Sequence, residues 1–166
     1  LLVEGQTKAG STVTVTLNGV PYPATVDADG YWSATIPASV LQGLNDGSYN
    51  VTVAVTDSAG NTNSQTTAVT LLTATPAFTL APVAGDGWLN STEAGQPLTV
   101  NGTGTFGDTV TVTLHGKTYT TTVDNTGSWS VEVPTSDLAT LANGSSYTVG
   151  VTVSDVAGNS SSQQAT

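Results

Sequence analysis

Hydrophobic and polar residues alternate with a period of two over most of the chain, the pattern expected of half-buried β-strands. In residues 13–17, VTVTL, the valines and the leucine share one face and the threonines share the other. The same pattern predicts strands at 31–36, 49–55, 67–72 and 77–82. Turn-forming residues separate these stretches, at Asn18-Gly19 and at 27–30, DADG. The patterning therefore predicts an all-β chain with short strands.

A long internal repeat organises this pattern. Residues 13–33, VTVTLNGVPYPATVDADGYWS, return 97 positions later as 110–130, VTVTLHGKTYTTTVDNTGSWS. Residues 57–61, DSAGN, return as 155–159, DVAGN, at a spacing of 98, because one residue has been gained in a loop between. A repeat of this length that contains several strands indicates two copies of one module rather than one larger fold.

The repeat and the strand count predict two tandem immunoglobulin-like antiparallel β-sandwich domains. The first covers 1–74 and lacks its N-terminal strand, since the stretch before residue 98 has no counterpart in copy one. The second covers 75–166, and its last strand is expected to be truncated, since copy one continues further.

Four aromatic residues support an immunoglobulin-like interpretation. Trp32 and Trp129 occupy equivalent inward positions and are expected in the two cores. Tyr49 and Tyr147 stand near the start of the sixth strand, where a tyrosine corner is found in such sandwiches. The disulfide of antibody domains is absent, because the chain has no Cys.

The net charge of the chain argues against some classes of function. Lys8 and Lys117 are the only basic residues and the net charge is -10, which argues against nucleic-acid binding, since that requires a cationic surface. The acidic surplus suits divalent cations wherever carboxylates converge. The chain contains no run of about 18 apolar residues, so no transmembrane helix and no direct membrane insertion is expected.

Several loop motifs resemble those of a known family. The motifs are DADGYWS at 27–33, GDGWLNSTEAG at 85–95, DSAGN at 57–61 and DVAGN at 155–159. In order and spacing they resemble bacterial Ig-like repeats of giant secreted adhesins, the extender modules of RTX-type and biofilm-associated surface proteins. Trp88 departs from that family, which usually has an aliphatic residue in this loop.

The resemblance implies a structural role at the bacterial cell surface. Such modules are secreted in tandem, bind calcium near module junctions, and form a stiff stalk. For this chain it implies an extracellular, monomeric extender segment whose partners are neighbouring Ig-like repeats. The stalk would project a distal binding domain for surface attachment or biofilm formation.

Strand direction places the acidic turns. Odd strands run away from a module's N-terminal end and even strands run back, so the turns after even and odd strands gather at opposite poles. The loop at 84–93 then lies at the C-terminal pole and would meet the N-terminal turns of a following copy. Carboxylates converging in this way suit the six to eight oxygen ligands that Ca²⁺ prefers. The candidate ligands are Asp27, Asp29, Asp57, Asp86, Glu93, Asp124 and Asp155.

Other interpretations stay open at this point. Asp and Asn also occupy turns simply because they form Asx-turns. Trp88 could stack on a sugar, so the alternative function is a carbohydrate-binding or accessory Ig-like module of a secreted protein with weak glycan contact. The threonine stripes could order water or ice, although they fit the solvated side of ordinary strands. An enzyme is not expected: His115 is the sole His and lies in a turn, and no nucleophile motif accompanies it.

Overall fold

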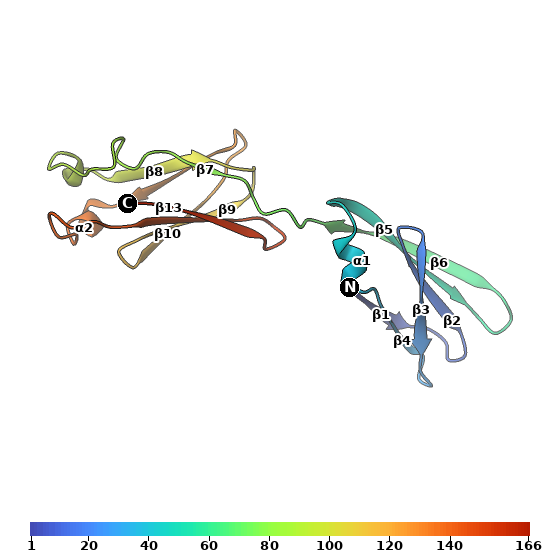
Figure 1. The fold of residues 1–166 in the computed structure, drawn as a ribbon. Helices are drawn as coiled ribbons and strands as arrows, with labels where there is room; N and C mark the ends of the chain where they lie inside the picture. The colour runs from blue at the N-terminus through green and yellow to red at the C-terminus, as the bar shows by residue number, and fades with distance from the viewer. The chain divides into compact units, whose positions relative to one another are not determined.

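The chain forms two compact units, here called unit 1, Leu1–Leu72, and unit 2, Thr73–Thr166. The computed structural model describes all 166 residues. Each unit is built from antiparallel strands with one short helix, and the antiparallel immunoglobulin-like sandwich predicted from the sequence is confirmed. Figure 1 shows the strands of each unit in two layers. No helix has the length and apolar character needed to cross a membrane.

Unit 1 contains six strands and one helical turn. The strands pair in the order β1-β4-β3-β2-β5-β6, and β3 joins the two layers because it pairs with both β2 and β4. In chain order the elements are β1 (Leu2–Gln6), β2 (Thr12–Leu17), β3 (Val20–Val26), β4 (Tyr31–Thr35), α1 (Ala38–Gln42), β5 (Gly47–Thr56) and β6 (Thr62–Leu71).

Unit 2 contains seven strands in two separate sheets. One sheet has the order β10-β9-β12-β13 and the other has the order β11-β8-β7. In chain order the elements are β7 (Thr79–Leu80), η1 (Glu93–Gly95), β8 (Leu98–Thr103), β9 (Thr109–Leu114), β10 (Lys117–Thr122), β11 (Ser128–Val133), α2 (Thr135–Leu138), β12 (Val149–Ser154) and β13 (Ser160–Ala165).

The apolar faces meet inside each unit as the alternation predicts. Trp32 and Trp129 are buried, at 9% and 3% exposed, and each lies in the core of its own unit. The core of unit 2 has the larger set of buried residues. Unit 1 buries Val13, Val15, Leu17, Trp32, Ala34, Ile36 and Val51, whereas unit 2 buries Leu98, Val100, Val110, Val112, Leu114, Val123, Trp129, Val131, Val133, Leu138, Val149, Val151 and Val153.

Local turn chemistry fixes the register of the first hairpin in each unit. Asn18 has a φ of 50° and Gly19 a φ of 78°, and His115 and Gly116 have 47° and 76°. Two consecutive residues with positive φ form the tight turn whose twist suits a two-residue hairpin. His115 is therefore a turn residue, and its ring makes an edge contact with Tyr147 at a centroid distance of 5.1 Å.

The two tyrosine corners differ in detail. The hydroxyl of Tyr49 donates to the backbone carbonyl of Asn45 at 2.7 Å, as a tyrosine corner requires. The hydroxyl of Tyr147 instead accepts a hydrogen bond from the backbone N–H of Ala142 at 2.7 Å. Both hydroxyls tie the start of the strand to the preceding loop.

Two strand boundaries differ from the sequence prediction. The strand expected over 77–82 is only Thr79–Leu80, because Pro76 and Pro82 flank it and lack the N–H that a longer ladder needs. The last strand of unit 1 was expected at 67–72 but runs from Thr62 to Leu71. Its first residues are exposed Thr, Asn, Ser and Gln, which carry no apolar alternation and pair through their backbones with β5.

Candidate functional site

The acidic turns predicted as metal ligands share one Asp-x-x-Gly geometry. In Asp57, Oδ1 accepts the backbone N–H of Ala59 at 2.8 Å and of Asn61 at 2.9 Å, and Oδ2 accepts the side-chain amide of Asn61 at 2.9 Å. Gly60 has a φ of 88°, a conformation that glycine adopts without strain. The Asp side chain thus satisfies the amides of its own turn, as in an Asx-turn.

The equivalent turn of unit 2 repeats these contacts. Asp155 accepts the N–H of Ala157 and of Asn159, both at 2.9 Å, and the Asn159 side-chain amide at 2.8 Å. The repeat therefore preserves not only the residues but also the hydrogen bonds that hold the turn.

Two further turns vary the same motif. Asp27 Oδ1 accepts the backbone N–H of Asp29 at 3.0 Å and of Tyr31 at 2.8 Å. Asp124 Oδ1 accepts the N–H of Thr126 at 2.8 Å and of Ser128 at 2.9 Å, and also the Thr126 hydroxyl at 2.6 Å. All four turns therefore hold a carboxyl group in a fixed orientation at the surface.

Hydrogen bonding stabilises the charged form of these carboxylates. The side-chain amide of Asn61 lowers the pKa of Asp57 below its ordinary value, and Asn159 does the same for Asp155. For Asp124 the Thr126 hydroxyl is the main cause of a lowered pKa. Each of these three carboxylates therefore keeps its negative charge to a lower pH than an ordinary Asp does.

Strand pairing gathers three loops at one end of unit 2, here called the N-terminal pole of unit 2: 104–108, 123–128 and 155–159. The backbone N–H of Gly104 bonds to Gly127, and the N–H of Val123 bonds to Asp108. Thr109 and Ser154, which border the first and third loops, pair directly. Asp124 and Asp155 therefore lie at the same pole, as the strand directions predicted.

Asp108 is the unusual carboxylate of this pole. It is only 5% exposed, and its Oδ2 atom is buried without a hydrogen-bond partner. Burial raises the pKa of Asp108, and the negative charge of Asp155 raises it further. Unit 1 has Ser11, also buried, at the equivalent position 97 residues earlier.

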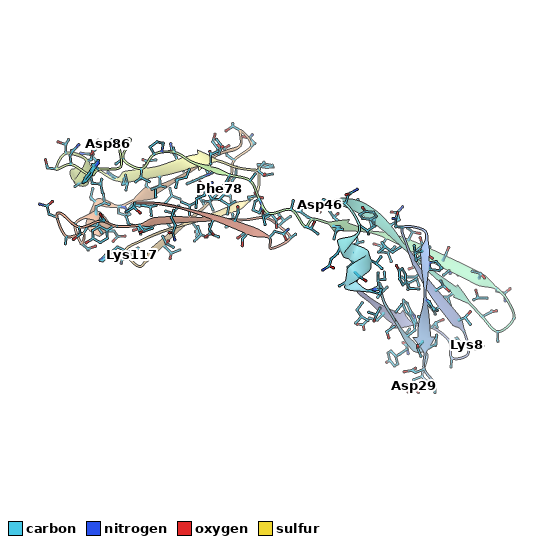
Figure 2. The ribbon with its side chains drawn as sticks, viewed as in Figure 1. Lys8, Asp29, Asp46, Phe78, Asp86 and Lys117 are labelled. Atoms are coloured by element: carbon cyan, nitrogen blue, oxygen red, sulfur yellow. The ribbon has the colours of Figure 1, made fainter.

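Asp86 and Glu93 lie at the opposite pole of unit 2. Figure 2 shows Asp86 toward the end of unit 2 that also carries Lys117. Asp86 Oδ1 accepts the N–H of Trp88 at 2.9 Å. Asn90 Oδ1 accepts the N–H of Glu93 at 3.1 Å while Glu93 Oε2 accepts the N–H of Asn90 at 3.0 Å, which is the reciprocal pattern of a capping box around η1.

The predicted ligand set is divided among three places. Asp27, Asp29 and Asp57 belong to unit 1, where Asp29 lies at the end that also carries Lys8, away from Asp46 (Figure 2). Asp124 and Asp155 share the N-terminal pole of unit 2, and the remaining two lie at its C-terminal pole. No group of three or more Asp, Glu, His or Cys side chains is arranged to hold a metal ion. The seven ligands therefore stay a prediction.

Asp108 was not among those candidates. In the sequence it resembles any other turn Asp, and its burial depends on how the loops at the pole come together. The one indication available was the difference between copies: a carboxylate stands where copy one has Ser11.

Comparisons with known proteins agree with the repeat. A family model described as a bacterial Ig-like domain matches residues 2–73 and 72–166. A search of curated proteins gave no match. Among solved structures, a Ca²⁺-stabilised adhesin that helps an Antarctic bacterium reach out and bind ice is 37% identical, with a TM-score of 0.50 over 98% of this chain. This chain spans 41% of the length of that structure.

Two other similar structures come from large adhesion proteins. A bacterial ice-binding adhesin, studied for its retention at the host cell surface, is 37% identical, with a TM-score of 0.48, and covers 98% of this chain and 55% of its own. A tetra-tandem repeat from the extending region of a large adhesion protein is 30% identical, with a TM-score of 0.44, and covers 98% and 43%.

Proposed function

This chain belongs to the bacterial Ig-like domain family, and from that premise we propose that it is an extender segment in the stalk of a bacterial cell-surface adhesin. The observation that carries the proposal is the repetition itself. The six strands β1–β6 of unit 1 recur as β8–β13 in unit 2, with the same Asp-x-x-Gly turns, whereas a ligand-specific site would be expected in one copy only. The similarity to a segment of a Ca²⁺-stabilised adhesin supports the same role.

We also propose that Ca²⁺ binds at the N-terminal pole of unit 2. Asp108, Asp124 and Asp155 lie at this pole without being grouped around one metal position, so a bound cation would draw them together through the carboxylate oxygens that it prefers. The buried Oδ2 of Asp108 has no partner, and a cation would satisfy it and reduce its repulsion with Asp155. The predicted ligands at other poles, Asp86 and Glu93 among them, would serve junctions with neighbouring repeats.

Calcium dependence suits a stalk that functions outside the cell. Sites in extracellular modules bind Ca²⁺ with a Kd of about 10⁻⁴–10⁻³ M, so they fill outside the cell and stay empty in the cytosol. A bound ion would limit bending between successive repeats. The stalk would then hold a distal binding domain away from the surface for attachment or biofilm formation.

Small-angle scattering tests the stalk and the calcium site together. The sample is a chain with whole repeats on both sides of unit 2, measured with a chelator and with calcium at about ten times the expected Kd. We expect calcium to increase the maximum dimension, and Asp108→Ser or Asp155→Asn to abolish the change. Glu132→Gln, an exposed mid-strand carboxylate, is the matched control. A profile that does not respond to calcium would reject calcium rigidification.

One observation favours a second candidate, a carbohydrate-binding module. The side chain of Trp88 is 79% exposed at the C-terminal pole of unit 2, and exposed aromatic rings can stack on sugars. Glycan-array binding that disappears in Trp88→Ala would support this function. Unchanged array signals in that variant would exclude Trp88 as the platform.

A further inference from the structure

The outer edge of β10 in unit 2 has no neighbouring strand. Its sheet has the order β10-β9-β12-β13, so β10 pairs with β9 on one side only. In unit 1 the equivalent strand β3 also pairs with β4, where Thr25 faces Ser33 and Val26 faces Trp32. No such pairs join β10 to β11, which lies in the other sheet. Because β10 lies between β9 and β11 in the chain, its open edge does not result from a chain end.

The hydrogen bonds of the hairpin show which backbone groups face this edge. Leu114 faces Lys117 across the two-residue turn, and the N–H of Val123 donates to the carbonyl of Asp108, just before β9. The odd-numbered positions of β10 therefore bond toward β9. Bonding groups on an antiparallel strand alternate between its two sides, so the even-numbered positions direct their N–H and C=O groups to the open edge. These positions are Thr118, Thr120 and Thr122, and their side chains are exposed.

The equivalent edge of unit 1 is closed to pairing by proline. Pro21 and Pro23 in β3 stand where β10 has Thr118 and Thr120, 97 residues later. Proline has no N–H to donate, and prolines on an edge strand protect a sheet against pairing with another chain. Unit 2 has the same strand without this protection, and it keeps both N–H groups free for a partner.

The two ends of β10 carry opposite charges. Lys117 at its start is the only Lys or Arg of unit 2, and its side chain is 60% exposed. Asp124 follows the other end. An antiparallel copy of the strand brings Lys117 of each beside Asp124 of the other, because neighbouring strands lie about 4.8 Å apart, within a Debye length of about 8 Å. All other charged side chains of unit 2 are acidic, so this edge is where a second copy meets an opposite charge.

We propose that β10 pairs antiparallel with β10 of a second copy of this chain, about a two-fold axis. Thr120 then faces its own equivalent and Thr118 faces Thr122, so the outward N–H and C=O groups of each edge meet their complements. Since both copies use the same edge, the assembly closes at two chains. Two six-residue strands bury less than the roughly 1,200 Å² of a stable interface, so the pairing is reversible and the dilute chain is a monomer.

Sedimentation equilibrium of the full 166-residue chain in chelator tests the pairing separately from any effect of calcium. We expect the average mass to rise with concentration from one chain toward two, and no further. The variant Thr118→Pro/Thr120→Pro gives β10 the prolines of β3 and removes two of its three outward N–H groups. It should weaken association at least ~100-fold, since each proline removes a hydrogen bond at two symmetric places.

The same variant should stay folded. The N–H groups that it removes bond to nothing within unit 2, and β3 shows that this hairpin accepts proline at both positions. The unfolding midpoint of unit 2 should therefore stay within a few degrees of the wild type. In the wild type, hydrogen exchange should slow at the amides of Thr118, Thr120 and Thr122 as the concentration rises.

A second variant tests the charges at the ends of the strand. Lys117→Gln removes the attraction to Asp124 of the second copy, so association should weaken by roughly 3- to 10-fold. Lys8→Gln in unit 1 changes the net charge by the same amount and is the matched control, for which we expect little change.

Three results would overturn the proposal. They are a mass of one chain up to millimolar concentration, equal association of the Thr118→Pro/Thr120→Pro chain and the wild type, and concentration-dependent protection at β6 or β13 instead of β10. Equal weakening by Lys117→Gln and Lys8→Gln would exclude the antiparallel arrangement of the two ends.

Discussion

At the scale of single residues, the exposed turn carboxylates and the buried carboxylate of Asp108 contribute to stability in opposite ways. Asp57, Asp124 and Asp155 are bonded by the amides of their own turns and have lowered pKa values. Asp108 is buried with an unsatisfied oxygen and has a raised pKa. The first kind stabilises the folded unit when ionised, and the second kind opposes folding when ionised.

Replacing Asp108 with the residue of the other copy should stabilise unit 2 in the absence of metal. Asp108→Ser removes a buried carboxylate oxygen without a partner, so we expect unfolding free energy to rise by about 1–3 kcal/mol at neutral pH in chelator. The same variant should gain less from calcium than the wild type. Urea denaturation with and without calcium measures both effects, and Ser11→Ala in unit 1 is the control. A loss of stability in chelator would contradict the account of Asp108.

The turn carboxylates predict the acid sensitivity of unit 1, which has no equivalent of Asp108. The folded pKa of Asp57 lies below its unfolded value, so its contribution is present above the ordinary carboxyl pKa, about 3.9, and is lost as pH falls through the folded pKa. Asp57→Asn should flatten the dependence of unit 1 stability on pH in this acidic range. Denaturation followed by Trp32 fluorescence, with Trp88 and Trp129 changed to Phe, measures it. A slope identical to wild type would assign the acid sensitivity to other groups.

At the scale of elements, unit 2 anchors its short helix to the neighbouring strand through a hydrogen bond that unit 1 lacks. The Tyr119 hydroxyl in β10 donates to Asp137 Oδ2 in α2 at 2.6 Å, and Lys117 lies 4.0 Å from Asp137 Oδ1. Burial and this carboxylate raise the pKa of Tyr119 to about 12. In unit 1 the equivalents are Tyr22, whose hydroxyl is buried without a partner, and Val40.

Exchanging these helix residues between the units should destabilise unit 2 and stabilise unit 1. Asp137→Val leaves the Tyr119 hydroxyl without its acceptor, so we expect unit 2 to lose about 1–3 kcal/mol. Val40→Asp gives Tyr22 an acceptor and should stabilise unit 1 by a smaller amount, because the new carboxylate is partly desolvated. Thermal unfolding of the two variants, with Tyr119→Phe as the control for the hydroxyl, checks the pair. Stabilisation of unit 2 by Asp137→Val would contradict the anchoring role.

At the scale of the whole molecule, the two units should unfold separately. Unit 1 buries fewer residues than unit 2, and its β1 lacks the cover that β7 gives to β8. Because buried apolar area dominates stability, unit 1 should unfold at lower urea than unit 2. Single-tryptophan chains retaining only Trp32 or only Trp129 report each unit, with Trp88 changed to Phe in both. One coincident transition would show that the units are coupled.

Most of the fold follows from patterns that a sequence displays directly. Period-two alternation identifies the strands because each sheet has one buried face and one solvent-exposed face. Asn18-Gly19 fixes the first hairpin because its two-residue turn needs two positive φ angles. The alternating directions of the strands then place the acidic turns at the poles.

The remainder depends on contacts between distant segments. The polar first half of β6 forms through backbone pairing, which leaves no apolar alternation in the sequence. The burial of Asp108 and the bond from Tyr119 to Asp137 arise only when separate loops or elements meet in space. In the sequence they are marked only by differences between the copies, since Ser11 corresponds to Asp108 and Val40 to Asp137. A difference between two copies does not indicate which of the two residues has a function.

The direction in which the first and last segments of unit 2 run has a mechanical consequence. Ser161 in β13 donates its hydroxyl to the Pro76 carbonyl, and Gln163 donates to the Phe78 carbonyl at 3.3 Å, so the two segments lie parallel. Tension applied through the two chain ends would therefore slide these segments past each other and load both bonds at once. Hydrogen bonds loaded together in shear need a larger force to break than bonds opened one after another. Unit 2 should therefore resist a force that pulls along its strands.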